Sequence, residues 1–160
     1  MLSLRTEAES VATALETGLF DVTDAVRWAD RQIERSDVPD TAICDAAMAG
    51  SKYPQDVAFI LRQVPGECDQ AQAVRLVLRY ALDALEQGRR DPRQVARALF
   101  DLAYAGDLPK GKLRGQAWGY WDAIDLARHG CARQTEKQIT ADMASAIGGF
   151  LASQPEDAHR

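Results

Sequence analysis

Residues that typically begin or end helices recur at short intervals along the 160-residue chain, and the segments between them are long enough only for short helices. Between these signals apolar residues recur with the helical period of about 3.6, and no stretch alternates apolar and polar residues as a half-buried strand does. Gly18, Gly50, Gly88, Gly106 and Gly130 each follow such a segment, where a helix end favours glycine. The sequence therefore predicts an all-α fold, a compact single-domain bundle of seven or eight short helices.

Capping residues give the expected helix bounds. Asp91 with Gln94, and Thr135 with Gln138, have the spacing of a capping box, in which each side chain accepts a hydrogen bond from the other residue's backbone. Pro54 suits a first helical position, because proline lacks the N–H group that would be unpaired there. The expected helices cover residues 4–17, 22 or 24–38, 41–49, 54–64, 69–87, 92–105, 113–129 and 136–152.

Composition is that of one soluble domain. With 46% hydrophobic residues, residues 1–152 can bury a core as one all-helical domain, and 153–160 are expected to form a frayed C-terminal tail. The segments 69–87 and 92–105 are apolar around more than half of the helix, which predicts central helices. Gly148 and Gly149 lower helix propensity by up to about 1 kcal/mol each, and close helix contact is the expected reason for them.

Charge and cysteine usage restrict the partners and the compartment. The formal charge of −5 argues against nucleic acid as the main partner, because clustered cations supply that affinity. Cys44, Cys68 and Cys131 have neither disulfide-framework nor zinc-ribbon spacing, as expected in a reducing compartment. No apolar run reaches the length of a signal peptide or a membrane span. We expect a cytoplasmic protein that makes no membrane contact.

Three expected helices each carry a large aromatic residue away from the apolar stripe. Trp28 projects about 130° from the stripe that Val26 and Ile33 share, and Phe59 and Trp118 are similarly displaced. One interpretation is that the helices cross steeply and each aromatic covers a neighbouring pair. The other is that these aromatics anchor an interface, since tryptophan is enriched there.

The second interpretation gives the main functional hypothesis, a non-catalytic protein-binding module. Residues 1–69 carry a net charge of −7, which suits a basic partner. The partner is another protein or a second copy of this chain. The expected partner-binding residues are Trp28, Asp24, Asp30, Asp37, Phe59 and Trp118.

The alternative hypothesis is nucleic-acid or phosphate binding. Residues 70–115 have a net charge of +4, and "LPKGKLRG" places glycines and cations before a helix. The segment lacks the P-loop pattern, and no aromatic platform interleaved with the cations is evident. The residues of this hypothesis are Arg89, Arg90, Arg93, Arg97, Lys110, Lys112 and Arg114.

The sequence shows no catalytic, metal or cofactor motif, so we expect no enzyme, no metal site and no cofactor. His129 is one of only two histidines, and at a helix end it suits the last carbonyl groups. Glu67, Cys68 and Asp69 resemble a polar helix entry rather than a cation site, and Asp122 with Asp125 resembles solvated charge.

The segment "VTDAVRWADRQIERSDVPD" resembles the entry segment of small, largely uncharacterised helical bacterial proteins, through Val22, Trp28, Ala29, Asp30 and Ile33. Some of these are thought to be immunity proteins encoded beside secreted toxins. The resemblance implies a binding protein that masks a toxin and has no catalytic activity.

Overall fold

The computed structural model describes residues 1–153, and within them it contains nine helices and no strand. This confirms the all-α fold class. The predicted frayed tail at 153–160 falls largely outside the described residues, although Ser153 is the last residue of a helix. None of the described helices is both long and apolar enough to cross a membrane.

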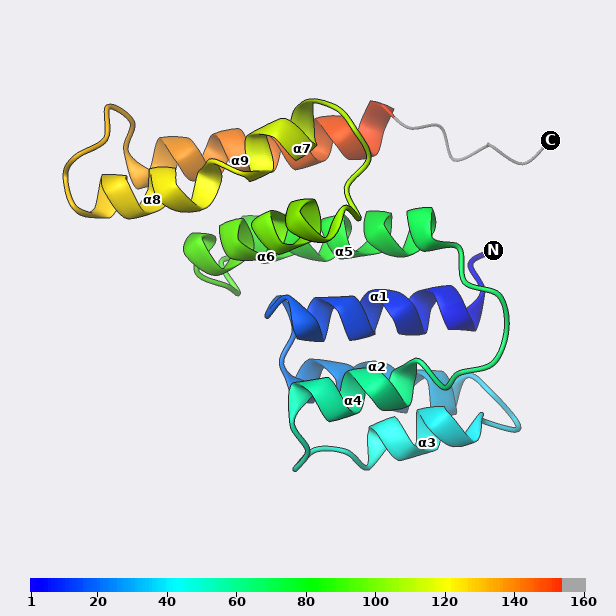
Figure 1. Ribbon diagram of the computed structural model, residues 1–160. Coiled ribbons are helices and arrows are strands. Elements are labelled where there is room, and N and C mark those ends of the chain that lie inside the picture. Colours follow the sequence, from blue (N-terminus) through cyan, green and yellow to red (C-terminus); the bar gives the residue numbers. More distant parts are fainter. Residues whose placement is uncertain (154–160) are drawn as a thin grey trace. The chain divides into compact units, whose positions relative to one another are not determined.

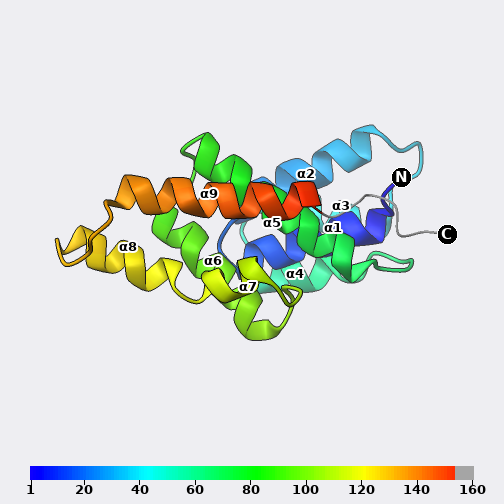
Figure 2. The same ribbon diagram turned by 90° about the horizontal axis from the view of Figure 1, so that it is seen from above.

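The described helices form two compact units, and the boundary between them lies at Val77–Leu78, inside α5 (Gln70–Glu86). The prediction of a single domain, and the central position of residues 69–87 in it, therefore stay predictions. Each unit has its own set of helix contacts (Figures 1 and 2).

The first unit is built from α1 (Leu4–Glu16), α2 (Val22–Glu34), α3 (Thr41–Ala47) and α4 (Pro54–Leu61), and ends with the first part of α5. α1 packs against α4 and α2, while α2 also contacts α3 and α4 (Figure 1). The α2 helix begins with a capping box, in which Asp21 and Asp24 each accept a backbone hydrogen bond from the other residue. Neighbouring helices thus cover α2 on more than one side.

Trp28 belongs to the core of this unit. Its side chain is only 5% exposed and lies in a cluster of fifteen buried residues, eight of which are alanines. The assignment of Trp28 as a surface anchor is therefore wrong. The physical reason is that α2 contacts three helices, so residues beyond its main apolar stripe are also buried.

An ion-pair group lies beside this core. Glu9 is 7% exposed, and its carboxylate binds Arg5 at 2.8 Å and Arg62 at 3.0 Å. Arg62 also donates two hydrogen bonds to Glu16, and these bonds are the main reason that its pKa is raised. The pairing of Glu9 is required because an unpaired charge in that position would be strongly destabilising. Arg62 thereby connects the end of α4 to α1 at two points, Glu9 and Glu16.

The second unit contains the rest of α5, α6 (Pro92–Ala105), α7 (Lys112–Ala117), α8 (Tyr120–Arg128) and α9 (Glu136–Ser153). α7 and α8 follow each other, and both contact α6 and α9 (Figure 2). The capping boxes predicted before α6 and α9 are confirmed. Gly106 ends α6 with a φ of 80°, a left-handed conformation that favours glycine.

The predicted helix over residues 113–129 is wrong in one respect, because it is two helices. α7 ends at Ala117 and α8 begins at Tyr120, with Trp118 and Gly119 between them. Gly115 and Gly119 both lie in this segment, and glycine lowers helix propensity by about 1 kcal/mol relative to alanine. The chain therefore interrupts its helix next to a large aromatic residue.

Close helix contact does not account for the two glycines of α9. A Cβ atom placed at Gly148 or at Gly149 would meet no atom within 4 Å. Both positions face open space, so the expectation of a tight helix crossing at this point is wrong.

Arg128 joins three helices of the second unit. Its guanidinium binds Glu136, at the start of α9, at 2.6 Å, and Asp91, the N-cap of α6, through two hydrogen bonds. These bonds from Arg128 lower the pKa of Asp91 below its ordinary value of 3.8. The carboxylate is thus held in its charged form at the point where α6 begins.

Replacing Trp28 by alanine should lower the free energy of unfolding by about 3–5 kcal/mol, because it leaves a large void in an alanine-rich core. Denaturant unfolding followed by far-UV circular dichroism measures this loss. Phe59→Ala is the matched control, since Phe59 is 67% exposed and should lose about 1 kcal/mol or less. Equal unfolding midpoints for the two variants would contradict the core position of Trp28.

The second unit should become less stable at acidic pH, because protonation of Asp91 removes its ion pair with Arg128. Because the folded state lowers the pKa of Asp91, the stabilisation is present at neutral pH and is lost as the pH falls through about 4 and below. Asp91→Asn should keep the N-cap but lose the ion pair, at a cost of about 1 kcal/mol or less.

Thermal unfolding at pH 7 and at pH 3 tests this expectation. Wild type should lose more stability between these two conditions than Asp91→Asn. Asp40→Asn is the control, because Asp40 caps α3 through the Ala42 N–H and forms no ion pair within the described residues. The same pH dependence in all three proteins would argue against the role of Asp91.

Candidate interaction surface

Six side chains of the second unit form one surface of aromatic rings and guanidinium groups, called here the aromatic–arginine surface. α6 supplies four of them, the junction between α7 and α8 supplies one, and the first turn of α8 supplies one. Along α6 the four residues are spaced by four, three and four positions, which places them on one side of the helix. The six residues are Arg93, Arg97, Phe100, Tyr104, Trp118 and Trp121.

The rings of this surface contact one another. The Phe100 ring lies 5.2 Å from that of Trp118 in an edge-on arrangement and 6.0 Å from that of Trp121. Tyr104 lies 6.4 Å from Trp118, also edge-on. Such edge-on pairs are favourable beyond the area that they bury. Phe100 therefore holds the three other rings in one connected group.

The two arginines cover one of the rings. The guanidinium carbon of Arg97 lies 4.6 Å from the centre of the Trp121 ring, and that of Arg93 lies 5.3 Å from it. Arg97 also pairs with Asp101 at 3.0 Å, and Arg93 with Asp125 at 3.2 Å. Each guanidinium thus lies against a ring and within ion-pair distance of a carboxylate.

Two rings of this surface remain exposed despite these contacts. Tyr104 is 77% exposed and Trp118 is 43% exposed, whereas Phe100 and Trp121 are half-buried. Exposure of large rings in a connected group leaves apolar area in water that a partner could cover. The surface is therefore ordered and still open.

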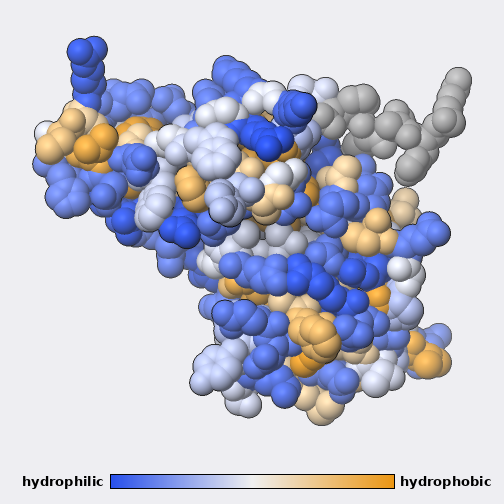
Figure 3. Space-filling model, in the orientation of Figure 1, coloured by the Kyte–Doolittle hydropathy of each residue, from blue (hydrophilic) through white to orange (hydrophobic). Residues whose placement is uncertain are grey.

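The predicted partner-binding residues do not form one surface within one unit. Trp28 is buried, and Asp24 belongs to the capping box of α2. Asp30, Asp37 and Phe59 are exposed in the first unit, while Trp118 lies in the second. On the face that Figure 3 shows, the exposed apolar side chains of the first unit form separate patches.

The predicted cationic residues all lie in the second unit, and the structure separates them. Arg93 and Arg97 belong to the aromatic–arginine surface, whereas Lys110 and Lys112 line a groove beside α7 and α9. Arg89 and Arg90 lie in the turn before α6, and Arg114 lies on α7. The structure does place rings beside one of these cations, because Phe100 and Trp121 contact Arg97.

The surface was partly predictable. The spacing of Arg93, Arg97, Phe100 and Tyr104 is visible in the sequence as one helix face. The contribution of Trp118 and Trp121 was not, because it depends on the break between α7 and α8. In one continuous helix, Trp121 would share an apolar stripe with Ala117 and Ile124.

The structure gives one of the groups considered for catalysis, His129, a structural role. The Nδ1–H group of His129 lies 2.7 Å from the Asp125 carbonyl oxygen, as expected for a residue that caps a helix end. Burial raises the pKa of the Cys68 thiol, which keeps that thiol protonated and poorly nucleophilic. Among the residues that the structure describes, no three His, Cys, Asp or Glu side chains are grouped to hold a metal ion.

No protein-family model matches the chain, no curated protein matches it, and no solved structure matches its fold.

Proposed function

We propose that this protein is a non-catalytic binding protein whose aromatic–arginine surface takes a protein partner. The observation that carries the proposal is the exposure of Trp118 and Tyr104 within a connected group of rings. Tryptophan, tyrosine and arginine are the residues that most often supply the binding energy of protein interfaces. This surface combines all three types.

The fixed arginines support a protein partner. Because Arg93 and Arg97 already rest on Trp121 and are paired with carboxylates, little side-chain freedom is lost when a partner binds. When a partner binds, each guanidinium can replace its ion pair with Asp101 or Asp125 by an ion pair with a carboxylate of the partner. A polyanion finds fewer free cations here, because Asp101 and Asp125 offset the two charges.

Nucleic acid is the second candidate, and one observation favours it. Rings and guanidiniums lie together, as in surfaces that stack the bases of single strands. The net charge of −5 and the internal ion pairs favour the protein partner over this alternative.

The proposal includes a cytoplasmic location, which the three free cysteines support. An inhibitory, immunity-like role is the more specific form of the proposal and rests on the resemblance of residues 22–40. The apolar residues of that segment serve the core of the first unit, since Trp28 and Ala29 are buried. A masked toxin would therefore bind elsewhere, and the aromatic–arginine surface is the site that we propose.

The test compares wild type with the double variant Tyr104→Ala/Trp118→Ala. Both are used to capture proteins from nuclease-treated native cell extract, quantified by mass spectrometry, and the captured partner is then titrated in purified form. We expect a loss of affinity of about 30-fold or more, because two anchoring rings are removed. Sedimentation of the purified protein measures self-association in parallel.

The matched control is Tyr53→Ala/Phe59→Ala, which removes two exposed rings from the first unit. Tyr53 is 77% exposed, as is Tyr104, so both double variants remove comparable exposed area. This control should keep wild-type binding. Equal capture by all three proteins would overturn the proposal, and tight binding of a single-stranded oligonucleotide with a steep salt dependence would replace it with the nucleic-acid alternative.

A further inference from the structure

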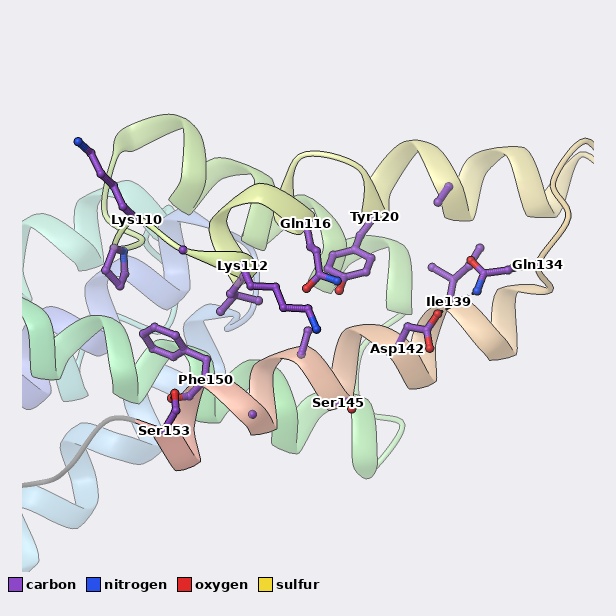
Figure 4. A pocket seen from close by; sticks show the side chains of 16 residues that line it. Lys110, Lys112, Gln116, Tyr120, Gln134, Ile139, Asp142, Ser145, Phe150 and Ser153 are labelled. Atoms are coloured by element: carbon purple, nitrogen blue, oxygen red, sulfur yellow. Dashed lines mark hydrogen bonds between the residues drawn. The ribbon is translucent and has the colours of Figure 1, made fainter.

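A groove of about 810 Å³ lies in the second unit, separate from the aromatic–arginine surface. The loop before α7, together with α7 and α8, forms one side, and α9 forms the other (Figure 4). Its volume lies in the range of sites that bind small organic molecules. Apolar side chains that include Leu113, Ile139 and Phe150 line it together with polar ones.

Tyr120 supplies an unsatisfied polar group in the wall of this groove. The residue is 8% exposed, and its hydroxyl has no hydrogen-bond partner among the described residues. Buried hydroxyl groups are normally paired, because an unpaired one costs free energy. Burial and the charge of Asp142 raise the pKa of this phenol, so the hydroxyl keeps its proton and can donate it in a hydrogen bond.

Two long side chains of α7 lie in the groove near Tyr120. Figure 4 shows the Gln116 amide beside the Tyr120 ring, and the Lys112 chain reaching along the groove from the other end of α7. Both residues are exposed and lie on a six-residue helix. A ligand can therefore displace their ends and reach the Tyr120 hydroxyl without a change in the backbone.

Charged side chains of both signs line the groove, namely Lys110 and Lys112 at the start of α7 and Asp142 on α9. Figure 4 shows the Lys110 ammonium group turned away from the groove. Lys112 forms no ion pair within the described part of the chain, and Figure 4 shows its ammonium group inside the groove. Asp142 faces it from α9, and the Gln134 amide donates to one oxygen of this carboxylate at 2.9 Å. The second oxygen of Asp142 stays available. A ligand that satisfies all these groups carries an anion and a cation close together.

On the α9 side, one residue that lines the groove is Gly149, which has no side chain to fill it. A Cβ atom at Gly149 would meet no atom within 4 Å, so the absence of a side chain there keeps space open. Helix packing does not explain why a glycine occupies this position. A need to keep space for a ligand in the groove explains it.

We propose that this groove binds a small zwitterion of the α-amino-acid type with a large apolar side chain. The carboxylate would accept a hydrogen bond from the Tyr120 hydroxyl and pair with Lys112, while the ammonium group would bind Asp142. The apolar side chain would lie toward Leu113 and Phe150. This site is independent of the protein-binding surface proposed above.

Calorimetric titration of the full chain with L-phenylalanine and L-leucine tests the proposal. Saturable binding is expected for both. N-acetyl-L-phenylalanine lacks the ammonium group and L-phenylalaninamide lacks the carboxylate, so each should bind about tenfold or more weakly than L-phenylalanine. No saturable binding of the two amino acids up to about 10 mM would overturn the proposal. If L-phenylalanine and its two derivatives bind equally well, the assignment of a zwitterionic ligand would be overturned.

Two variants locate the site. Tyr120→Phe keeps the ring, should fold at least as stably as wild type, and should weaken L-phenylalanine binding about fivefold or more. Gly149→Leu should fill the groove and abolish binding, while its thermal midpoint stays equal or rises because leucine favours the helix.

Gly148→Leu is the matched control. Gly148 is the neighbouring residue of the same helix, also faces open space, and is not part of the groove wall. This variant should gain the same helix propensity and keep wild-type binding. Binding that survives in Gly149→Leu, or that is lost equally in both glycine variants, would overturn the assignment of the ligand to this groove.

Discussion

The first unit depends on one large side chain placed among small ones. About half of its buried cluster is alanine, and alanine contributes little apolar area per residue. Helices lined with alanine approach closely, but a core of this kind gains its stability from the few large residues that fill what remains. Trp28 is the largest of them, and it is buried because α2 has helices on more than one side. The same crowding brings Glu9 next to Arg5 and Arg62, so that its charge is compensated.

The two units use arginine in different ways. In the first, Arg62 compensates a nearly buried carboxylate and so permits the packing of α1 on α4. In the second, Arg128 ties three helix ends together, while Arg93 and Arg97 rest on Trp121 at the surface. The planar guanidinium suits both uses, because it pairs with carboxylates through its edge and stacks on rings through its face.

The fold was largely predictable from local chemistry, and the site only in part. Capping boxes at Asp91 and Thr135 and a terminal Gly106 are short-range signals, so the helix bounds followed from them. The break at Gly119 was missed because glycine is a weak signal inside an apolar pattern. The burial of Trp28 and the exposure of Trp118 differ although both lie off their helical stripes. That difference depends on which helices become neighbours, and no local pattern encodes it.

The distribution of the three tryptophans gives each unit its own optical signal. Trp28 is the sole indole of residues 1–77 and lies in an apolar core, where emission is shifted to shorter wavelength than in water. Trp118 is partly in water, and Trp121 lies under two guanidinium groups. The fluorescence of Trp28 therefore reports the melting of the first unit alone. The chain carries, without any added label, the means to observe whether its two halves unfold in one step or in two.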